Sequence, residues 1–333
     1  MTTARPAPAI EVAGLNKHYG RTQVLDGVGF SVAENIITGL LGRNGAGKTT
    51  IMSILSGQEP KSSGTLRVFG AEPFENASVL ARMCFVRENQ KYPEDFKTDH
   101  VLRTGPWFFE NWSAELAGEL VEAFRLPVKT KIKKLSRGQL SAVAIIVGMA
   151  SRAPLTIFDE PYLGLDATAR AIFYDRLLKD YMEHPRTVLM STHLIDEAAN
   201  LLEHVVVIDR GRKVLDMGVE EAKSAAFTLS GPAAAVEAAT AGRTVMRTQS
   251  LGGLRSATVQ GRADAQARSL AAEHGLELGG VSLQDLVSAY GLLEDPAAAA
   301  AVPGAVPSGR GPGSDNGRAP RRAASTENME ALR

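Results

Sequence analysis

One stretch of eight residues constrains the fold of this chain more than any other: Gly42-Arg43-Asn44-Gly45-Ala46-Gly47-Lys48-Thr49, which we call the phosphate loop. It follows an apolar run at residues 36–41 and precedes a helical pattern that ends at Gly57. A bound phosphate needs converging backbone N–H donors, which glycines allow by letting the chain wrap closely, and the following helix adds its N-terminal dipole. A strand, this loop and a helix in that order predict a nucleotide phosphate site, with Thr50 as a further contact.

Lys48 and Thr49 have the most defined roles within the phosphate loop. The Lys48 ammonium reaches β- and γ-phosphates, and the Thr49 hydroxyl is a ligand for Mg²⁺. Mg²⁺ keeps several waters and takes few protein ligands beside the phosphates. The expected bound species is a nucleotide with Mg²⁺, and an ordinary glycine-rich turn is the alternative.

A second motif supplies the acidic half of such a site. The apolar run at residues 155–158 delivers Asp159 and Glu160 at its C-terminal end, which is where the sites of α/β sheets lie. Asp159 is expected to hold Mg²⁺ through water, and Glu160 to polarise the water that attacks the phosphate. An acidic pair at a strand end is common by chance, so the prediction depends on its combination with the phosphate loop.

Apolar runs that alternate with helical patterns between about Ile10 and Gly218 predict an α/β fold. Four runs are typical of strands buried on both faces, and hence of a largely parallel sheet: residues 36–41, 155–158, 187–190 and 205–208. Helices are indicated by apolar residues spaced four apart: Phe173, Leu177 and Tyr181, and then Leu116, Leu120 and Phe124 after the candidate cap Ser113.

The composition excludes several classes of protein. Lys plus Arg and Asp plus Glu both number 37 among 333 residues, and this formal charge of +0 argues against nucleic-acid binding. No window approaches the roughly 18 consecutive apolar residues of a membrane span, and residues 1–8 lack the apolar region of a signal peptide. Because Cys84 is the single cysteine, no internal disulfide can form, and a reduced cytoplasmic setting is expected.

The residues beyond the α/β region form two parts. Residues 227–291 have the pattern strand, Ala-rich helix, two strands, helix and a closing helix, which suits a small split β-α-β domain. From Pro296 onward Ala, Gly, Pro and Ser dominate, which predicts disorder. The expected organisation is a nucleotide-binding domain over 10–222, a small α+β domain over 223–293 and a disordered tail over 294–333.

Between the two phosphate-site motifs, Leu135-Ser136-Arg137-Gly138-Gln139 resembles the LSGGQ signature of ABC ATPases, the nucleotide-binding subunits of ABC transporters. Other motifs of that family stand in the right order around it: Tyr19, Gln90, Leu163-Gly164-Leu165-Asp166 and His193. The resemblance covers about Ile10 to Gly218. It implies a P-loop ABC ATPase core with a mixed sheet, a helical subdomain over about 92–150, and ATP with Mg²⁺ as the bound species.

The resemblance also implies roles for single residues. Tyr19 would stack on adenine, and His193 would contact the γ-phosphate. Ser136 and Gly138 would face the γ-phosphate bound to another subunit, and Asp166 would relay the state of one site to the other. Taken singly, Tyr19 also fits a surface tyrosine, His193 a structural histidine and Asp166 a helix cap.

Two positions depart from the family pattern. Arg137 stands where the family most often has Gly, and it would either add a charge near phosphate or face solvent. In the segment after residue 84, Gln90 is preferred as the residue that contacts Mg²⁺, and Glu88 fits almost as well. The predicted metal ligands are Thr49, Gln90 and Asp159.

One phosphate loop and one signature occur here, so the resemblance implies pairing with a copy of the chain or with a related subunit. It implies separate transmembrane permease subunits, a cytoplasmic location on the inner face of the cell membrane, and ATP hydrolysis that drives export of the drug or antibiotic-efflux type.

Four aromatic residues lie within the expected helical subdomain: Trp107-Phe108-Phe109 and Trp112. They would line a groove for the membrane subunit or, as the preferred interpretation, pack inside the helical subdomain. The alternative is a soluble ABC ATPase acting on ribosomes or DNA, but such proteins carry two nucleotide domains or a long coiled coil, and neither pattern appears.

Overall fold

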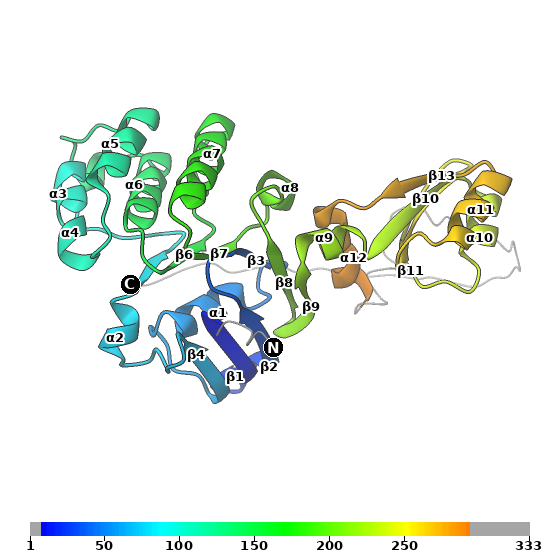
Figure 1. Cartoon of the computed structure of the whole chain (residues 1–333), viewed down its shortest axis with the longest axis horizontal. Helices are drawn as coiled ribbons and strands as arrows, with labels where there is room; N and C mark the ends of the chain where they lie inside the picture. Colours follow the sequence, from blue (N-terminus) through cyan, green and yellow to red (C-terminus); the bar gives the residue numbers. More distant parts are fainter. Residues whose placement is uncertain (1–7, 294–333) are drawn as a thin grey trace, which may run out of the picture.

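A computed structural model describes residues 8–293 of the chain. Its centre is a six-stranded sheet with the order β5-β6-β7-β3-β8-β9 (Figure 1). Neighbouring strands are parallel except in the β8-β9 hairpin, so the sheet is mixed, as expected. In chain order its strands are β3 (Ile37–Leu41), β5 (Met83–Val86), β6 (Leu155–Asp159), β7 (Thr187–Ser191), β8 (His204–Asp209) and β9 (Arg212–Gly218).

The four strands predicted from apolar runs are all confirmed. Strands β3, β6 and β7 are buried at every residue. A parallel sheet of this kind must be covered on both faces, because its apolar side chains alternate between them. The two covering layers differ in kind, one being a second sheet and the other a set of helices.

The second sheet lies on one face, with helix α1 between the two sheets (Figure 1). One cluster of buried residues joins all three layers through side chains such as Leu40, Met52 and Leu66. Helix α1, which follows β3 through the phosphate loop, is therefore held in place by apolar contacts on both sides. This layer contains β1 (Ile10–Tyr19), β2 (Thr22–Val32) and β4 (Ser63–Val68) in the antiparallel order β2-β1-β4, and α1 (Lys48–Leu55).

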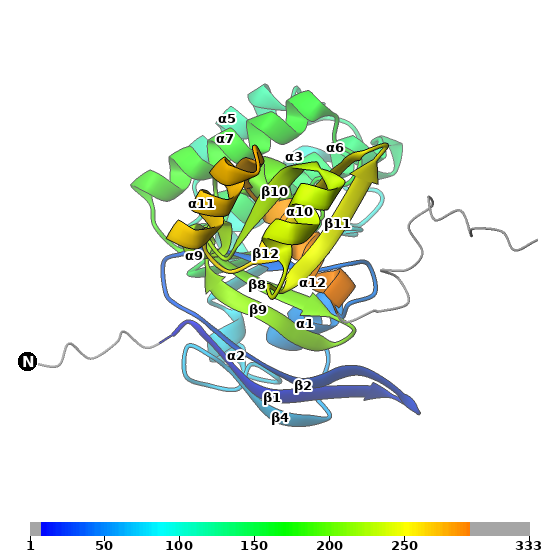
Figure 2. The ribbon, with the colours of Figure 1, turned by 90° about the vertical axis from the view of Figure 1, so that its right-hand side faces the viewer.

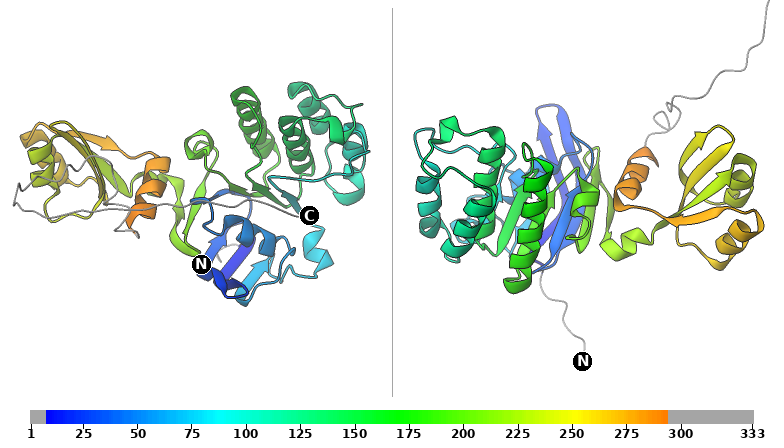
Figure 3. Two further views of the ribbon diagram at one scale, coloured as in Figure 1. Left: turned by 180° about the vertical axis from the view of Figure 1, so that it is seen from behind. Right: turned by 90° about the horizontal axis from the view of Figure 1, so that it is seen from above.

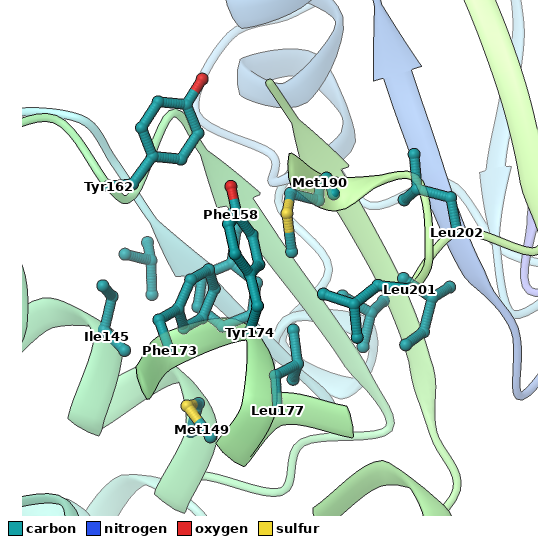
Figure 4. Packing of buried hydrophobic residues seen from close by; sticks show 14 of the residues in the cluster. Ile145, Met149, Phe158, Tyr162, Phe173, Tyr174, Leu177, Met190, Leu201 and Leu202 are labelled. Atoms are coloured by element: carbon teal, nitrogen blue, oxygen red, sulfur yellow. The ribbon is translucent and has the colours of Figure 1, made fainter. Parts of the chain in front are cut away.

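Helices cover the opposite face. Phe173 and Leu177 of α7 pack into the cluster drawn in Figure 4, where the rings of Phe173 and Phe158 meet edge to face at 5.5 Å. The Ser113 hydroxyl accepts a hydrogen bond from the Leu116 N–H at 3.2 Å, so the predicted cap of α5 is confirmed. The helices of this layer and the short ones near it are α3 (Thr98–Arg103), α4 (Gly105–Phe108), α5 (Ala114–Ala123), the 3₁₀ turn η1 (Ile132–Lys134), α6 (Arg137–Ala150), α7 (Ala167–Glu183) and α8 (Ile195–Ala198). The short helix α2 (Ala77–Leu80) instead buries Val79 in the cluster of the second sheet.

The aromatic stretch of this helical layer is split between surface and interior. Phe109 and Trp112 stack at 6.4 Å and are partly buried. Trp107 and Phe108 are 79% and 69% exposed. The preferred interpretation, packing inside the subdomain, is therefore wrong for Trp107 and Phe108, because Trp112 already occupies the space against Gly105.

The C-terminal part contains an antiparallel sheet of order β11-β12-β10-β13, with α10 and α11 on one face (Figure 2). Its elements are β10 (Ala226–Pro232), α10 (Ala233–Thr240), β11 (Val245–Leu251), β12 (Leu254–Gln260), α11 (Ala265–Glu273) and β13 (Glu277–Gly280). This is the split β-α-β pattern. Strand β13 has no counterpart in the predicted order, because a Glu-Leu-Gly-Gly segment has low β-propensity and only its pairing with β10 makes it a strand.

The closing helix α12 (Leu283–Leu293) returns to the nucleotide-binding part of the chain. Its residues Leu283, Leu286 and Val287 are buried in the same cluster as Leu201 and Leu202 of the main fold. With α9 (Val219–Lys223), this helix lies between the six-stranded and four-stranded sheets, where it is drawn in orange (Figure 3). In residues 8–293 no helix is long and apolar enough to cross a bilayer. The predicted tail, 294–333, and residues 1–7 lie outside the described residues.

Candidate nucleotide site

The phosphate loop connects β3 to α1, and two of its glycines are required by sterics. Gly42 has φ 145, and a Cβ at that position would lie 2.1 Å from the carbonyl oxygen of Ile208. Gly47 has φ 106, and a Cβ there would lie 2.6 Å from the Leu25 side chain. Side chains other than hydrogen are therefore excluded at both ends of the turn, which brings backbone N–H groups to the N-terminus of α1.

The Lys48 side chain lies along the inside of this loop. Its Nζ donates hydrogen bonds to the carbonyl oxygens of Gly42 at 2.8 Å and Arg43 at 3.2 Å. Burial lowers the pKa of Lys48, and the charges of Glu160 and Asp159 act in the opposite direction. The ammonium group is thus held in the loop, 4.0 Å from Oε1 of Glu160.

A cavity of about 510 Å³ opens beside the loop. It is lined by Val24, Asn44, Gly45, Gly47, Lys48, Thr49, Thr50, Glu88, Glu160, Leu163 and His193. The structure therefore brings together most of the expected loop residues with Glu160 and His193. Three residues of the loop do not line the cavity: Gly42, Arg43 and Ala46. Asp159 does not line the cavity either and is 3% exposed.

Asp159 and Glu160 are joined by a residue that the sequence motifs do not single out. The Ser191 hydroxyl donates to Oδ1 of Asp159 at 2.7 Å and accepts the backbone N–H of Glu160 at 2.9 Å. Ser191 is fully buried at the end of β7, in parallel register with Asp159. The sequence could have indicated this role for Ser191 only if the order of the strands had been known, because Ser191 and Asp159 end neighbouring strands.

Glu160 has an unusual backbone conformation, with φ 49. Positive φ is uncommon for a residue other than glycine, and at functional sites it is maintained by the surrounding structure. Two groups hold the Glu160 side chain. Oε2 accepts a hydrogen bond from the Tyr162 hydroxyl and lies 2.6 Å from Nδ1 of His193.

Tyr19 lies at the margin of the site. Its hydroxyl donates to Glu59, whose carboxylate is also 3.2 Å from Nζ of Lys17, and the Thr50 hydroxyl is a further hydrogen-bond neighbour. The ring is 46% exposed, and Lys17 Nζ lies 4.8 Å from its centroid. Partial burial, more than the hydrogen bond and negative charge of Glu59, raises the pKa of Tyr19. The ring is thus tethered at its hydroxyl and open on the surface near Thr50.

The two candidates of the 85–90 segment differ in their relation to the cavity. Glu88 lines the cavity beside the phosphate loop, and both Glu88 and Gln90 line a neighbouring cavity of about 220 Å³. Glu88 also forms a 3.2 Å ion pair with Arg137 of the signature. Of the two residues, the structure brings Glu88 and not Gln90 to the phosphate site.

The signature is built as the start of a helix. The Ser136 hydroxyl accepts from the Gln139 N–H at 3.2 Å, and the Gln139 side chain accepts from the Ser136 N–H at 3.0 Å, so the two form a capping box at α6. A Cβ on Gly138 would lie 2.4 Å from the carbonyl oxygen of Gly164, so only glycine allows this close approach. Ser136 is exposed and does not line the cavity of its own chain, and neither does Gly138. Asp166 caps α7 by accepting from the Ala169 N–H at 2.8 Å.

A metal ion at this site would have to be held largely by its nucleotide. The described residues hold no group of three or more His, Cys, Asp and Glu side chains arranged to bind a metal. The oxygen ligands near the loop include the Thr49 hydroxyl and the Glu88 carboxylate, which line the cavity together with Thr50 and Glu160, and the Asp159 carboxylate, whose charge acts on Lys48. This small set of oxygen donors fits Mg²⁺, which prefers oxygen and usually takes one or two carboxylates together with phosphates.

Comparison with known proteins agrees with this geometry. The family model described as "ABC transporter" matches residues 25–163. A Nod factor export ATP-binding protein I of Rhizobium meliloti is 32% identical over 220 residues, which are 64% of this chain and 65% of that protein. The proteins of the same name from Paraburkholderia xenovorans and Cupriavidus metallidurans are 33% and 34% identical, over 63% and 62% of this chain and 71% and 70% of their own lengths. The chain thus spans about two thirds of the curated relatives that it matches.

Solved structures show the same fold. An ATP-binding subunit of an ABC transporter superposes with a TM-score of 0.58 at 24% identity, over 65% of this chain and 92% of that chain. A bacterial Atm1-family ABC exporter with ATP bound superposes with a TM-score of 0.55 at 21% identity, over 66% of this chain and 41% of that chain. Since relatives more than 30% identical are matched over more than two thirds of their length, the chain belongs to the ATP-binding proteins of the ABC transporter family.

Proposed function

We propose that this chain is the ATP-hydrolysing subunit of an ABC exporter. One observation supports this proposal above all: Lys48, Glu160 and His193 converge on the cavity that the phosphate loop lines, with Lys48 Nζ 4.0 Å from Glu160 Oε1 and His193 Nδ1 2.6 Å from Glu160 Oε2. A cation that binds phosphate and a carboxylate that accepts a proton from water are groups used in phosphoryl transfer to water, and the imidazole is a further hydrogen-bonding group beside them. Export is supported by the names of the curated relatives.

The reaction that these groups would perform is hydrolysis of the bond between the β- and γ-phosphates. A water oxygen bonds to the γ-phosphorus as the bond to the ADP oxygen breaks, and Glu160 accepts the proton that the water gives up. Lys48 and the loop N–H groups bind the charge that develops on the phosphate oxygens. His193, half exposed at the mouth of the cavity, would donate to a γ-phosphate oxygen and so sense its presence.

We propose Mg²⁺ as the metal of this site. Thr49 and Asp159 would hold it, with Asp159 acting through water, and Glu88 replaces Gln90 as the candidate ligand from the 85–90 segment because Glu88 lines the cavity. When bound, the ion neutralises phosphate charge and orients the nucleotide. Tyr19 would receive the adenine ring on its open face, a stacking contact that contributes about 1–3 kcal/mol.

The signature supports pairing of two nucleotide sites. Ser136 and Gly138 lie at the exposed N-terminus of α6 and do not reach the cavity of their own chain. A helix N-terminus attracts phosphate, so we propose that these residues complete the site of a second copy or of a related subunit. Asp166, which caps α7 close to the signature, would connect the two sites.

An apolar cavity supports a separate membrane partner. It has a volume of about 830 Å³ and is lined mainly by apolar and aromatic residues, among them Tyr92, Phe96, Trp107 and Phe108. Trp107 and Phe108 present their rings to solvent at its edge. Exposed aromatic patches of this kind mark interaction sites, and we propose that a transmembrane permease subunit docks here and holds the chain at the inner face of the cell membrane.

We also propose that the chain divides functionally near residue 223. Residues 227–276 contribute a cluster around Phe227, Leu229 and Val259 that is distinct from the clusters of the main fold, although Met246 in the same range is buried in the main cluster. The α12 packing described above would couple this unit to the nucleotide-binding domain at 10–222.

Hydrolysis can be tested with Glu160→Gln in the full chain. The amide keeps the size of the side chain and loses the proton-accepting carboxylate, so we expect steady-state ATP turnover to fall by about 100-fold or more, while ATP still binds and holds the chain as a dimer in size-exclusion chromatography. The control is Glu237→Gln, because Glu237 is an exposed carboxylate in α10 that pairs with Arg255. Wild-type turnover in Glu160→Gln would refute the proposed function.

A further inference from the structure

Tyr162 lies within the acidic motif but has no role in the reaction described above. It follows Asp159, Glu160 and Pro161 in the sequence, at the start of the segment that leads to α7. Its side chain is 2% exposed, although its hydroxyl is directed at the Glu160 carboxylate. A tyrosine in this position combines a ring buried in the core with a polar group at the reacting site.

The Tyr162 hydroxyl contacts both Glu160 and His193, and the Thr192 side chain is a further hydrogen-bond neighbour. The hydroxyl donates to Oε2 of Glu160, accepts the backbone N–H of His193 at 2.8 Å and lies 3.0 Å from Nδ1 of the His193 ring. The two rings meet edge to face at 5.3 Å. Tyr162, Glu160 and His193 therefore form one closed hydrogen-bonded unit that joins the acidic strand end to the loop after β7.

The ring supplies the rigidity of this unit. Tyr162 belongs to the same buried cluster as Phe158, Phe173 and Tyr174 (Figure 4). A tyrosine has only two side-chain torsions, so a packed ring leaves its hydroxyl in one position. Burial, more than the hydrogen bond to Glu160, raises the pKa of Tyr162 far above its usual value, so the hydroxyl remains a proton donor at neutral pH.

We propose that Tyr162 is a positioning residue for ATP hydrolysis: it fixes the orientation of the Glu160 carboxylate and of the His193 ring toward the γ-phosphate. Without the hydroxyl, Glu160 would lose a donor that opposes rotation of its carboxylate, and the positive-φ backbone of Glu160 would lose one of its constraints. Misorientation lowers the rate of the chemical step and leaves the binding of ATP unchanged, since Tyr162 does not line the cavity and its hydrogen bonds to Glu160 and His193 involve no residue of the phosphate loop. This inference rests on the proposed ATPase function.

The test is Tyr162→Phe in the full chain, which removes the hydroxyl and keeps the ring. We expect kcat for ATP hydrolysis to fall by about 10- to 100-fold, the effect of losing one hydrogen bond to a charged group, with KM for ATP within twofold of wild type and a folded chain by circular dichroism. The matched control is Tyr174→Phe, because Tyr174 is a buried tyrosine of the same cluster whose hydroxyl bonds neither Glu160 nor His193. Its kcat should equal that of the wild type.

The outcomes separate this proposal from the function on which it rests. If wild-type chain turns over ATP and Glu160→Gln does not, but Tyr162→Phe retains wild-type kcat, then the positioning role is wrong and the ATPase function stands. A parallel fall of kcat in Tyr174→Phe, or a change confined to KM, would likewise overturn the positioning role. If Glu160→Gln turns over ATP like the wild type, the proposed function itself is wrong.

Discussion

Ser191 provides the strictest test of how the two carboxylates are held. Its hydroxyl donates to Asp159 Oδ1 at 2.7 Å and accepts the Glu160 N–H at 2.9 Å, and the residue is fully buried. In Ser191→Ala both partners lose a bond at a site that water does not reach. A hydrogen bond to a charged group contributes about 1.5–3 kcal/mol and an unpaired buried N–H costs about 1–3 kcal/mol. Because the two losses share one atom and are not additive, we expect a decrease of about 2–4 kcal/mol in the free energy of unfolding.

Urea unfolding followed by tryptophan fluorescence measures this change. The only two tryptophans, Trp107 and Trp112, both lie in the helical layer that covers the six-stranded sheet, so the signal reports on that part of the chain. We also expect kcat for ATP hydrolysis to fall by about 10- to 100-fold, because small displacements of catalytic groups have effects of this size.

The matched control for this test is Ser151→Ala. Ser151 is also fully buried, and its hydroxyl donates to the Gly148 carbonyl at 2.7 Å and accepts from the Ala153 N–H at 3.3 Å, both neutral partners remote from the cavity. Its loss should cost about 1–2 kcal/mol and leave kcat unchanged. The reasoning about Ser191 is refuted if Ser191→Ala is no less stable than Ser151→Ala, or if it retains wild-type kcat.

Two further predictions concern nucleotide binding and the C-terminal helix. Lys48→Ala should weaken ATP binding by about 10- to 100-fold, since it removes a charged phosphate contact. Calorimetry measures this affinity, and the control is Lys61→Ala, which removes an exposed ion pair with Glu72. Unchanged affinity in Lys48→Ala would contradict the role of Lys48. Leu286→Ala should lower stability by about 2–5 kcal/mol in thermal unfolding followed by circular dichroism, because Leu286 is fully buried where α12 meets the main fold. Leu251→Ala, at a side chain 84% exposed, should have no effect, and equal melting temperatures for these two variants would show that α12 does not stabilise the fold.

Much of the architecture could be predicted from the chain because its signals are local. The runs that became β3, β6, β7 and β8 are continuous and apolar, so burial on both faces follows from composition alone. Strand β13 could not be predicted, because its four residues pair with β10 across about 50 positions of sequence and have little strand preference of their own. The exposure of Trp107 and Phe108 could not be predicted either. Apolar residues that are close together in sequence indicate a cluster, but they do not indicate which of the side chains are buried.

For the site, the sequence by itself determined the phosphate loop, the order of the motifs and the acidic pair, because each depends on residues adjacent in the chain. Only the tertiary structure decided how these parts act together. The parallel register of β6 with β7 places Ser191 beside Asp159, and the turn after β6 directs Tyr162 back to Glu160 and His193. That Glu88 and not Gln90 lines the phosphate cavity also follows only from the path of the backbone after β5. These contacts join residues about 30 or more positions apart, or depend on a single turn angle, and spacing along the chain specifies neither.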